Sequence, residues 1–184
     1  MKKVVLLLAD GFEEMEAVVV ADVLRRSGVE LFLVSVTGRE EVKGSHGIGV
    51  MADLLFEKVD FSEVEMVVLP GGMPGAAHLQ AHEGVRNLVA GVHSRGRMVA
   101  AICAAPMVLG SLGLLEKKQA TCYPGFEKYL QGALLSKEAV VEDGLLVTGN
   151  GPGSALNFAL RLAEKLQGRE VARGVAGKMM VTGW

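Results

Sequence analysis

The amino-acid sequence predicts an α/β fold, a three-layer sandwich in which helices flank a mostly parallel central sheet. Two observations lead to this prediction. Short apolar runs alternate with amphipathic segments from one end of the chain to the other, which is the order of strands and helices in α/β domains. Several of these runs are continuously apolar, as in strands that are buried on both faces.

The predicted elements follow one another without a linker, a repeat or a low-complexity segment, so residues 1–184 are expected to form a single domain. Strands are predicted at 4–9, 31–36, 66–69, 98–102 and 119–122. Helices, whose apolar residues recur at helical spacing, are predicted at 13–27, 83–94, 105–112 and 154–166. Two hairpins are predicted, one at a sheet edge over 47–52 and one around Asp143-Gly144.

The composition excludes several classes of protein. The 19 Lys and Arg residues against 21 Asp and Glu residues give a net charge of −2, without the clustered basic face of a nucleic-acid-binding protein. The hydrophobic content of 50% excludes disorder. The apolar run 4–9 stops at Asp10, which is too early for a signal peptide or a membrane span. With only two cysteines, we expect a cytoplasmic protein that has no nucleic-acid or membrane partner.

Cys103 is the strongest candidate for a reactive residue. It follows the predicted strand 98–102, lies among alanines and directly precedes a predicted helix. This strand–nucleophile–helix order is typical of a nucleophile elbow, where small neighbours are needed because the turn is tight. The positive end of the helix dipole is expected to favour the thiolate. A cysteine that is simply buried in the core is an equally good interpretation of its position alone.

Two further segments suggest what could assist such a cysteine. Glu16 lies in phase with the apolar residues of the helix 13–27, so it is expected to be buried, protonated and able to donate a hydrogen bond to a thiolate. Glu13 and Glu14 are expected to be solvated partners of the helix dipole, and a surface position is the alternative for Glu16 as well. Gly71-Gly72 follows the strand 66–69 and can direct backbone N–H groups into a cleft, as an oxyanion hole requires.

Together these segments resemble the ThiJ/PfpI superfamily, in its DJ-1 branch of Parkinson-associated deglycases. The motifs are Gly-Phe-Glu-Glu-Met-Glu at 11–16, Leu-Pro-Gly-Gly at 69–72 and Ala-Ile-Cys-Ala at 101–104, with supporting matches at 22–26, 142–145 and 151–153. The resemblance implies a flavodoxin-like sandwich and a homodimer. It also implies that Cys103 is the oxidisable nucleophile, that Glu16 is the protonated pocket acid, and that Gly72 and Ala104 supply the oxyanion N–H groups.

The sequence departs from the family pattern at the edge of the pocket. Tyr123 takes the place of the pocket histidine of the human-like branch, so no Cys-His dyad is expected, and His46 takes the place of an anion-contacting arginine. Ala104 stands where the protease branch has a histidine. The absence of a histidine after His93 argues against a glutamine amidotransferase.

Three weaker patterns are interpreted as structural. The glycine-rich segment 149–154 imitates a dinucleotide fingerprint, but too little chain follows it for a second βα unit. His78 and His82 have the spacing of metal ligands on a helix but lack a third ligand. Cys122 is expected to be a buried thiol, with a resolving role for Cys103 as the alternative. We therefore expect no metal and no cofactor.

The resemblance implies a stress-response protein that acts on reactive α-oxoaldehydes or on glycated proteins, as a cofactor-independent glyoxalase III-like lyase or a deglycase hydrolase. In the glyoxalase case Cys103 would attack methylglyoxal, and Glu16 would move the proton during rearrangement to a 2-hydroxy acid. The alternative is a non-catalytic peroxide sensor and chaperone that works through oxidation of Cys103. An intracellular cysteine peptidase is a third and less favoured interpretation.

Overall fold

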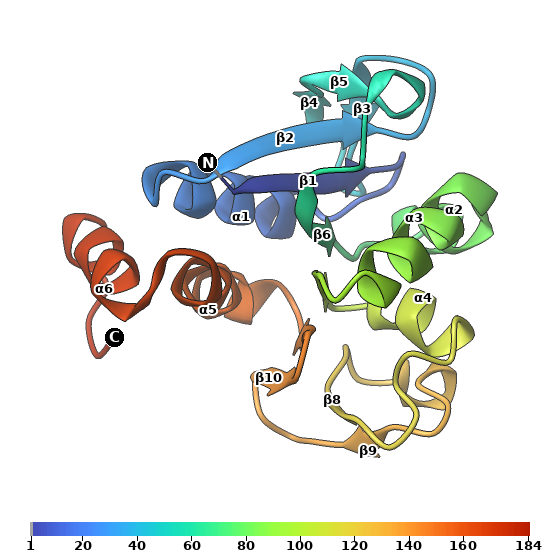
Figure 1. The fold of residues 1–184 in the computed structure, drawn as a ribbon. Helices are drawn as coiled ribbons and strands as arrows, with labels where there is room; N and C mark the ends of the chain where they lie inside the picture. Colours follow the sequence, from blue (N-terminus) through green and yellow to red (C-terminus); the bar gives the residue numbers. More distant parts are fainter. Residues whose placement is uncertain (1) are drawn as a thin grey trace.

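A central sheet of seven strands, with helices on both of its faces, forms the computed structural model, which describes residues 2–184 (Figure 1). Its strands are β1 (Lys3–Leu8), β2 (Glu30–Ser35), β5 (Leu54–Leu55), β6 (Val64–Leu69), β7 (Met98–Ile102), β10 (Val140–Asp143) and β11 (Leu146–Gly149). They lie in the order β10-β11-β7-β6-β1-β2-β5. Every neighbouring pair is parallel except β10 with β11. The predicted mostly parallel sheet is confirmed.

The helices divide into two groups, one on each face of the sheet (Figure 1). One face carries α1 (Glu14–Arg26), α5 (Ala155–Gln167) and α6 (Arg169–Lys178), and the other carries α2 (Gly75–Ala81), α3 (Glu83–Ser94) and α4 (Pro106–Ser111). Short 3-10 turns occur at Phe56–Lys58, Glu127–Tyr129 and Pro152–Ser154. This three-layer arrangement is the predicted flavodoxin-like sandwich.

Two small sheets lie outside the central one, and they correct two of the strand predictions. β3 (Glu41–Lys43) pairs with β4 (Gly49–Met51), and β8 (Gln119–Ala120) pairs with β9 (Leu134–Leu135). The predicted edge hairpin over 47–52 is wrong in two respects: this range contains only β4, whose partner β3 lies earlier in the chain, and the edge of the central sheet is β5. The predicted strand 119–122 ends at Ala120, because the next backbone N–H, that of Thr121, bonds the hydroxyl of Thr148 instead of a strand.

The helices α2 and α6 were not predicted from the sequence. The first has only seven residues and directly follows the Gly-Gly and Pro-Gly turns that end β6. The second buries only Ala172, Val175 and Ala176, so its apolar stripe is too narrow to stand out from its charged residues.

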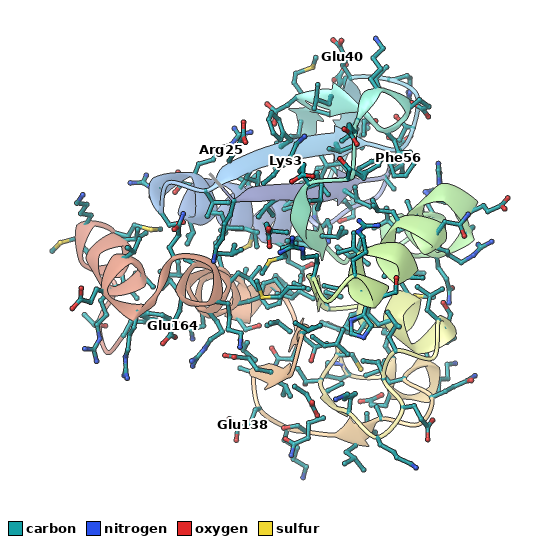
Figure 2. The ribbon with its side chains drawn as sticks, in the orientation of Figure 1. Lys3, Arg25, Glu40, Phe56, Glu138 and Glu164 are labelled. Carbon is teal, nitrogen blue, oxygen red and sulfur yellow. The ribbon has the colours of Figure 1, made fainter. Side chains whose placement is uncertain are left out.

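Apolar side chains fill the space between the sheet and both helical layers. Residues 4–8 of β1 are completely buried, as their continuous apolar run predicts. Figure 2 shows the side chains packed between the layers, with the labelled Arg25, Glu40 and Glu138 at the periphery. Among residues 2–184, no helix is both long and apolar enough to cross a membrane.

Candidate active site

The candidate residues converge at the carboxyl ends of four neighbouring parallel strands. The first helix α1 begins shortly after β1, the Gly-Gly turn follows β6, Cys103 follows β7, and the glycine-rich segment follows β11. Because β11, β7, β6 and β1 are consecutive in the sheet, residues as far apart in the chain as Glu14 and Gly149 meet in one place. Ligand sites of open α/β sheets occupy this edge.

The backbone at Cys103 forms the sharp turn that a nucleophile elbow requires. Cys103 has a φ of +63°, a left-handed conformation that is uncommon for a residue with a side chain. Its N–H donates to the carbonyl of Gly149 at 2.9 Å, and its carbonyl accepts from the N–H of Tyr123 at 2.8 Å. Two other segments thus hold the turn in place, and the side chain is left only 8% exposed.

Glu16 lies beside this turn and is the most buried carboxyl group of the site, with 0% exposure. Its Oε2 accepts a hydrogen bond of 2.7 Å from the N–H of Gly71. Among the described residues its Oε1 has no hydrogen-bond partner, and the Cys103 thiol lies next to the carboxyl group, whose pKa it lowers. Burial raises the pKa of Glu16 to about 7, against the opposing effect of the Gly71 N–H. The expected buried carboxyl group with a raised pKa is present.

Glycine is needed at both positions of the turn after β6 because the backbone there passes very close to the reactive groups. A Cβ on Gly71 would lie 2.5 Å from Cβ of Cys103 and 2.9 Å from Oε2 of Glu16. Gly72 has a φ of +85°, and a Cβ there would lie 2.5 Å from the N–H nitrogen of Glu13. The backbone N–H groups of Gly72 and Ala104 both act on the Cys103 thiol and lower its pKa, so these two groups lie next to the sulfur atom.

The ionisation of Cys103 differs from the expectation. Burial, followed by the negative charge of Glu16, raises the pKa of the Cys103 thiol to about 12, while the N–H groups of Gly72 and Ala104 lower it. The helix dipole does not overcome this, because α4 begins only at Pro106 and has just six residues. At neutral pH the Cys103 thiol therefore keeps its proton, and Glu16 is the neighbouring group that could accept it.

The backbone N–H of Tyr123 holds the Cys103 turn, whereas its ring lines a neighbouring groove. Its side chain is 46% exposed and lies against Gly151, whose Cβ would stand 3.2 Å from the ring. The ring forms one wall of a groove of about 480 Å³ beside the turn, whose other walls are Ala139, residues 150–154 and Asn157. The structure thus places Tyr123 at the rim of the site.

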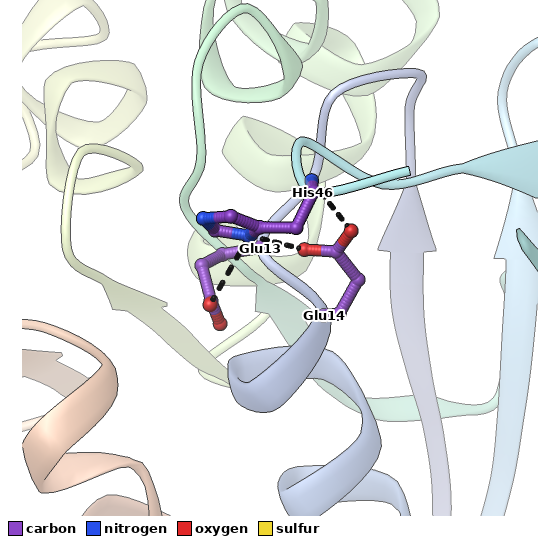
Figure 3. A group of neighbouring side chains, drawn as sticks. All are labelled: Glu13, Glu14 and His46. Carbon is purple, nitrogen blue, oxygen red and sulfur yellow. Dashed lines mark hydrogen bonds and ion pairs between the residues drawn. The ribbon is translucent and has the colours of Figure 1, made fainter. Parts of the chain in front are cut away.

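His46 and its two glutamate neighbours correct the expectation that Glu13 and Glu14 are solvated. Both glutamates are buried, and Glu13 caps α1 by accepting a 2.7 Å hydrogen bond from the N–H of Glu16. His46 packs over them from the β3–β4 turn, with its Nδ1 2.8 Å from Oε2 of Glu14 (Figure 3). Its ring lies on these carboxylates, outside the immediate surroundings of the thiol.

The charges of this group are strongly coupled. Burial alone would raise the pKa of Glu14, but hydrogen bonds from the ring of His46 and from the N–H groups of His46 and Ile48 outweigh it and lower the pKa to about 2. The same hydrogen bond raises the pKa of His46. Glu14 is therefore ionised at all physiological pH values.

The remaining candidates have structural roles. The Nδ1 atoms of His78 and His82 bond the carbonyl of Asp10 and the N–H of Val85, respectively. The glycine-rich segment leads into a 3-10 turn and then α5, as expected of a structural helix start. Cys122 is a buried free thiol, and burial raises its pKa to about 11.

Comparisons with known proteins agree with this geometry. The profile of the DJ-1/PfpI family matches residues 2–165. Protein DJ-1 homolog B of Arabidopsis thaliana is 41% identical over 98% of this chain, which spans 42% of that protein. The glutathione-independent glyoxalase DJR-1.2 of Caenorhabditis elegans is 31% identical over 90% of this chain and 89% of its own length.

Solved structures give the same result. The oxidized DJ-1 of Toxoplasma gondii is 35% identical and superposes with a TM-score of 0.95 over 99% of this chain and 100% of its own. On these sequence and structural matches, the chain belongs to the DJ-1/PfpI family.

Proposed function

We propose that this protein converts small α-oxoaldehydes such as methylglyoxal to 2-hydroxy acids, without a cofactor, through Cys103 and Glu16. The observation that carries the proposal is the pairing of a buried thiol with a wholly buried carboxyl group whose pKa is raised to about 7. A group with a pKa near the working pH can both accept and return a proton. The name of the C. elegans relative, a glutathione-independent glyoxalase, supports the same reaction class.

The first half of the proposed reaction forms a carbon–sulfur bond. Glu16 takes the proton of the Cys103 thiol, and the resulting thiolate attacks the aldehyde carbon. The negative charge moves to the aldehyde oxygen. The N–H groups of Gly72 and Ala104, which face the sulfur, are the donors available to that oxygen. Glu16 then returns its proton to the oxygen, which gives a neutral hemithioacetal.

The second half moves a hydrogen and breaks the carbon–sulfur bond. Glu16, ionised again, removes the proton from the former aldehyde carbon and delivers it to the neighbouring carbonyl carbon. The hydroxyl proton moves from the former aldehyde oxygen to the neighbouring oxygen, which gives a thioester of a 2-hydroxy acid. Water cleaves the thioester and restores the thiol, so methylglyoxal and water give lactate. The decisive experiment is D-lactate formation from methylglyoxal by the wild type and by Cys103→Ser. In the early adducts that glyoxals form with proteins, the former aldehyde carbon is also open to attack by Cys103. We therefore include deglycation of proteins in the proposed function.

Tyr123 is proposed to orient the substrate and to take no proton. A tyrosine hydroxyl has a pKa of about 10, so it does not replace the family histidine as a base near neutral pH. Tyr123→Phe removes one neutral hydrogen bond worth about 0.5–1.5 kcal/mol, so we expect turnover to fall by about tenfold or less. Steady-state rates of methylglyoxal loss measure this. Loss of all turnover in Tyr123→Phe would assign Tyr123 a catalytic role.

A peroxide-sensing role is the second candidate, because the related Toxoplasma gondii structure is of an oxidized protein. A protonated Glu16 would donate a hydrogen bond to the sulfinate of Cys103 and stabilise it. We therefore expect Glu16→Gln, whose amide is a weaker donor, to accumulate less sulfinate after mild peroxide treatment. Mass spectrometry of the peptide that contains Cys103 measures the difference, and equal sulfinate in both proteins would argue against the pairing.

The chain is also proposed to form a homodimer through an apolar surface made by α1 and the β3–β4 hairpin. Met15, Val18, Ile48 and Met51 are large apolar residues that are 56%, 48%, 59% and 60% exposed. The hydrogen bond of 3.3 Å from the N–H of Ile48 to Glu14 joins the hairpin to the helix, so the two elements that carry these exposed residues are neighbours.

A charge in that surface should separate the subunits. We expect light scattering to give about twice the chain mass of 19.4 kDa for the wild type and the monomer mass for Met15→Asp. Leu134→Asp is the matched control, since Leu134 is 58% exposed on β9, at the opposite end of the molecule (Figure 1). A monomeric wild type at micromolar concentration would refute the proposed dimer.

A further inference from the structure

We propose that Glu13, Glu14 and His46 form a binding site for one divalent transition-metal ion such as Zn²⁺, at the start of α1 (Figure 3). One ligand atom of each residue lies within 4.8 Å of the other two. The ligand atoms are Oε1 of Glu13, Oε2 of Glu14 and Nδ1 of His46. The positions 13, 14 and 46 do not have the spacing of a known metal motif, so the sequence alone does not reveal the group.

The two carboxylates are already held in the orientation that a metal needs. The N–H of Glu16 fixes Oε2 of Glu13 at 2.7 Å. The N–H groups of His46 and Ile48 fix Oε1 of Glu14 at 2.7 and 3.3 Å. Each carboxylate is thus anchored through one oxygen, while its other oxygen faces His46. Backbone donors that orient ligand groups in this way are typical of the outer shell of metal sites.

Oε1 of Glu13 is the atom that points to a missing cation. The Glu13 side chain is only 9% exposed, yet among residues 2–184 this oxygen accepts no hydrogen bond and its nearest cationic partner is Nδ1 of His46, 4.0 Å away. Glu14 beside it is 7% exposed and contacts the same nitrogen at 2.8 Å. One imidazole therefore faces two buried carboxylates. The single positive charge of one imidazolium offsets only one of the two carboxylates, and a divalent ion would neutralise both.

The spacing of the three atoms suits a small transition-metal ion. Tetrahedral Zn²⁺ with bonds of about 2.0–2.2 Å places its ligand atoms about 3.4 Å apart. On binding the ion, the distance from Nδ1 of His46 to Oε2 of Glu14 would increase slightly from 2.8 Å, and that to Oε1 of Glu13 would decrease slightly from 4.0 Å. The ion would replace the proton between His46 and Glu14. The ring of His46 is 70% exposed in the single chain, which leaves the remaining coordination position open there. An imidazole ligand favours Zn²⁺, Cu²⁺ or Ni²⁺ over Mg²⁺ and Ca²⁺.

The other histidines supply a matched control. His78 lies near the same end of the molecule, but its Nδ1 contacts the backbone carbonyl of Asp10 at 2.9 Å, and no acidic pair surrounds it. His78→Gln therefore removes one histidine from the chain without touching the proposed site, whereas His46→Gln removes a ligand whose exposed ring contributes nothing to the core.

The test is a titration of the full chain with Zn²⁺ in competition with a chromophoric chelator. Cys103→Ser is the background, so that this thiol binds no metal. We expect one Zn²⁺ per chain, an affinity at least about tenfold weaker in His46→Gln, and unchanged binding in His78→Gln. Glu13→Gln, which keeps an oxygen for the N–H of Glu16, should weaken binding similarly. Co²⁺ should show a visible absorption band that is lost in His46→Gln.

Several results would overturn the assignment. Equal Zn²⁺ affinity with and without the His46 imidazole would place the ion elsewhere, and loss of binding in His78→Gln would do the same. Absence of 1:1 binding in the Cys103→Ser background would show that Glu13, Glu14 and His46 hold no metal. None of these measurements depends on turnover. They therefore test the metal site independently of the proposed glyoxalase reaction.

Discussion

Replacing Cys103 with alanine should abolish the formation of D-lactate from methylglyoxal, and replacing Glu16 with glutamine should lower its rate by about a thousandfold. Without the thiol no carbon–sulfur bond forms, so only the uncatalysed reaction remains. Without the carboxylate the thiol keeps its proton, because the pKa of Cys103 is raised to about 12 by burial in the first place. General acid–base catalysis by one positioned group contributes about 10²- to 10⁴-fold, which sets the size of the expected loss.

The matched control for Glu16→Gln is Glu83→Gln. Glu83 also lies in the first turn of a helix, α3, but it is exposed and remote from the sulfur. Glu83→Gln should keep the rate of D-lactate formation within about twofold of the wild-type rate, as is usual for substitutions at exposed positions. An enzymatic assay specific for D-lactate, run on folded proteins of equal concentration, measures all three variants. Turnover that survives in Glu16→Gln but disappears in Tyr123→Phe would exchange the roles assigned to these two residues.

The central sheet and the elbow could be predicted from sequence because each depends on local patterns. Residues 4–9 and 98–102 are continuously apolar, and such runs match β1 and β7 to within one residue. Cys103 lies directly after one of these strands, so its position at the carboxyl edge followed from the fold class alone. The burial of Glu16 did not follow from its phase on α1, which left a surface position favoured; the family resemblance implied it.

The surroundings of Glu13 and Glu14 could not be predicted in the same way. Their burial depends on the β3–β4 turn, which reaches back over the start of α1 and brings His46 onto them. Gly44 is part of this packing, since a Cβ there would overlap the carboxyl group of Glu14. The spacing of Glu13 and Glu16 was the one local signal, because a side chain that caps a helix bonds the N–H three residues later.

The ionisation of Cys103 was mispredicted for a related reason. Sequence shows that a helix follows the cysteine, but it does not show that this helix has only six residues or that a wholly buried carboxyl group lies beside the sulfur. Burial and the charge of Glu16 depend on contacts between β6, β7 and α1. Such contacts between distant segments decide the electrostatics of a site, while local patterns decide its position.

The same carboxyl group should make the folded protein less stable as the pH rises. Burial raises the pKa of Glu16 from 4.5 to about 7, so the folded state binds this proton more tightly than the unfolded state does. Between these two values the unfolded chain loses the proton first, and the free energy of unfolding falls as the pH increases. At 1.36 kcal/mol per pKa unit, the difference of about 2.5 units corresponds to about 3 kcal/mol above pH 7.

Glu16→Gln removes this ionisation and should therefore stabilise the protein at pH 8, even though it removes activity. Relative to the wild type, the variant should gain about 2–3 kcal/mol between pH 5 and pH 8, or about 5–10 °C in melting temperature. Thermal unfolding followed by circular dichroism at both pH values measures the gain, and Glu83→Gln should show no such pH dependence. A stability difference between Glu16→Gln and the wild type that stays constant from pH 5 to pH 8 would mean that Glu16 has an ordinary pKa. Glu16 would then lack the raised pKa on which the proposed reaction depends.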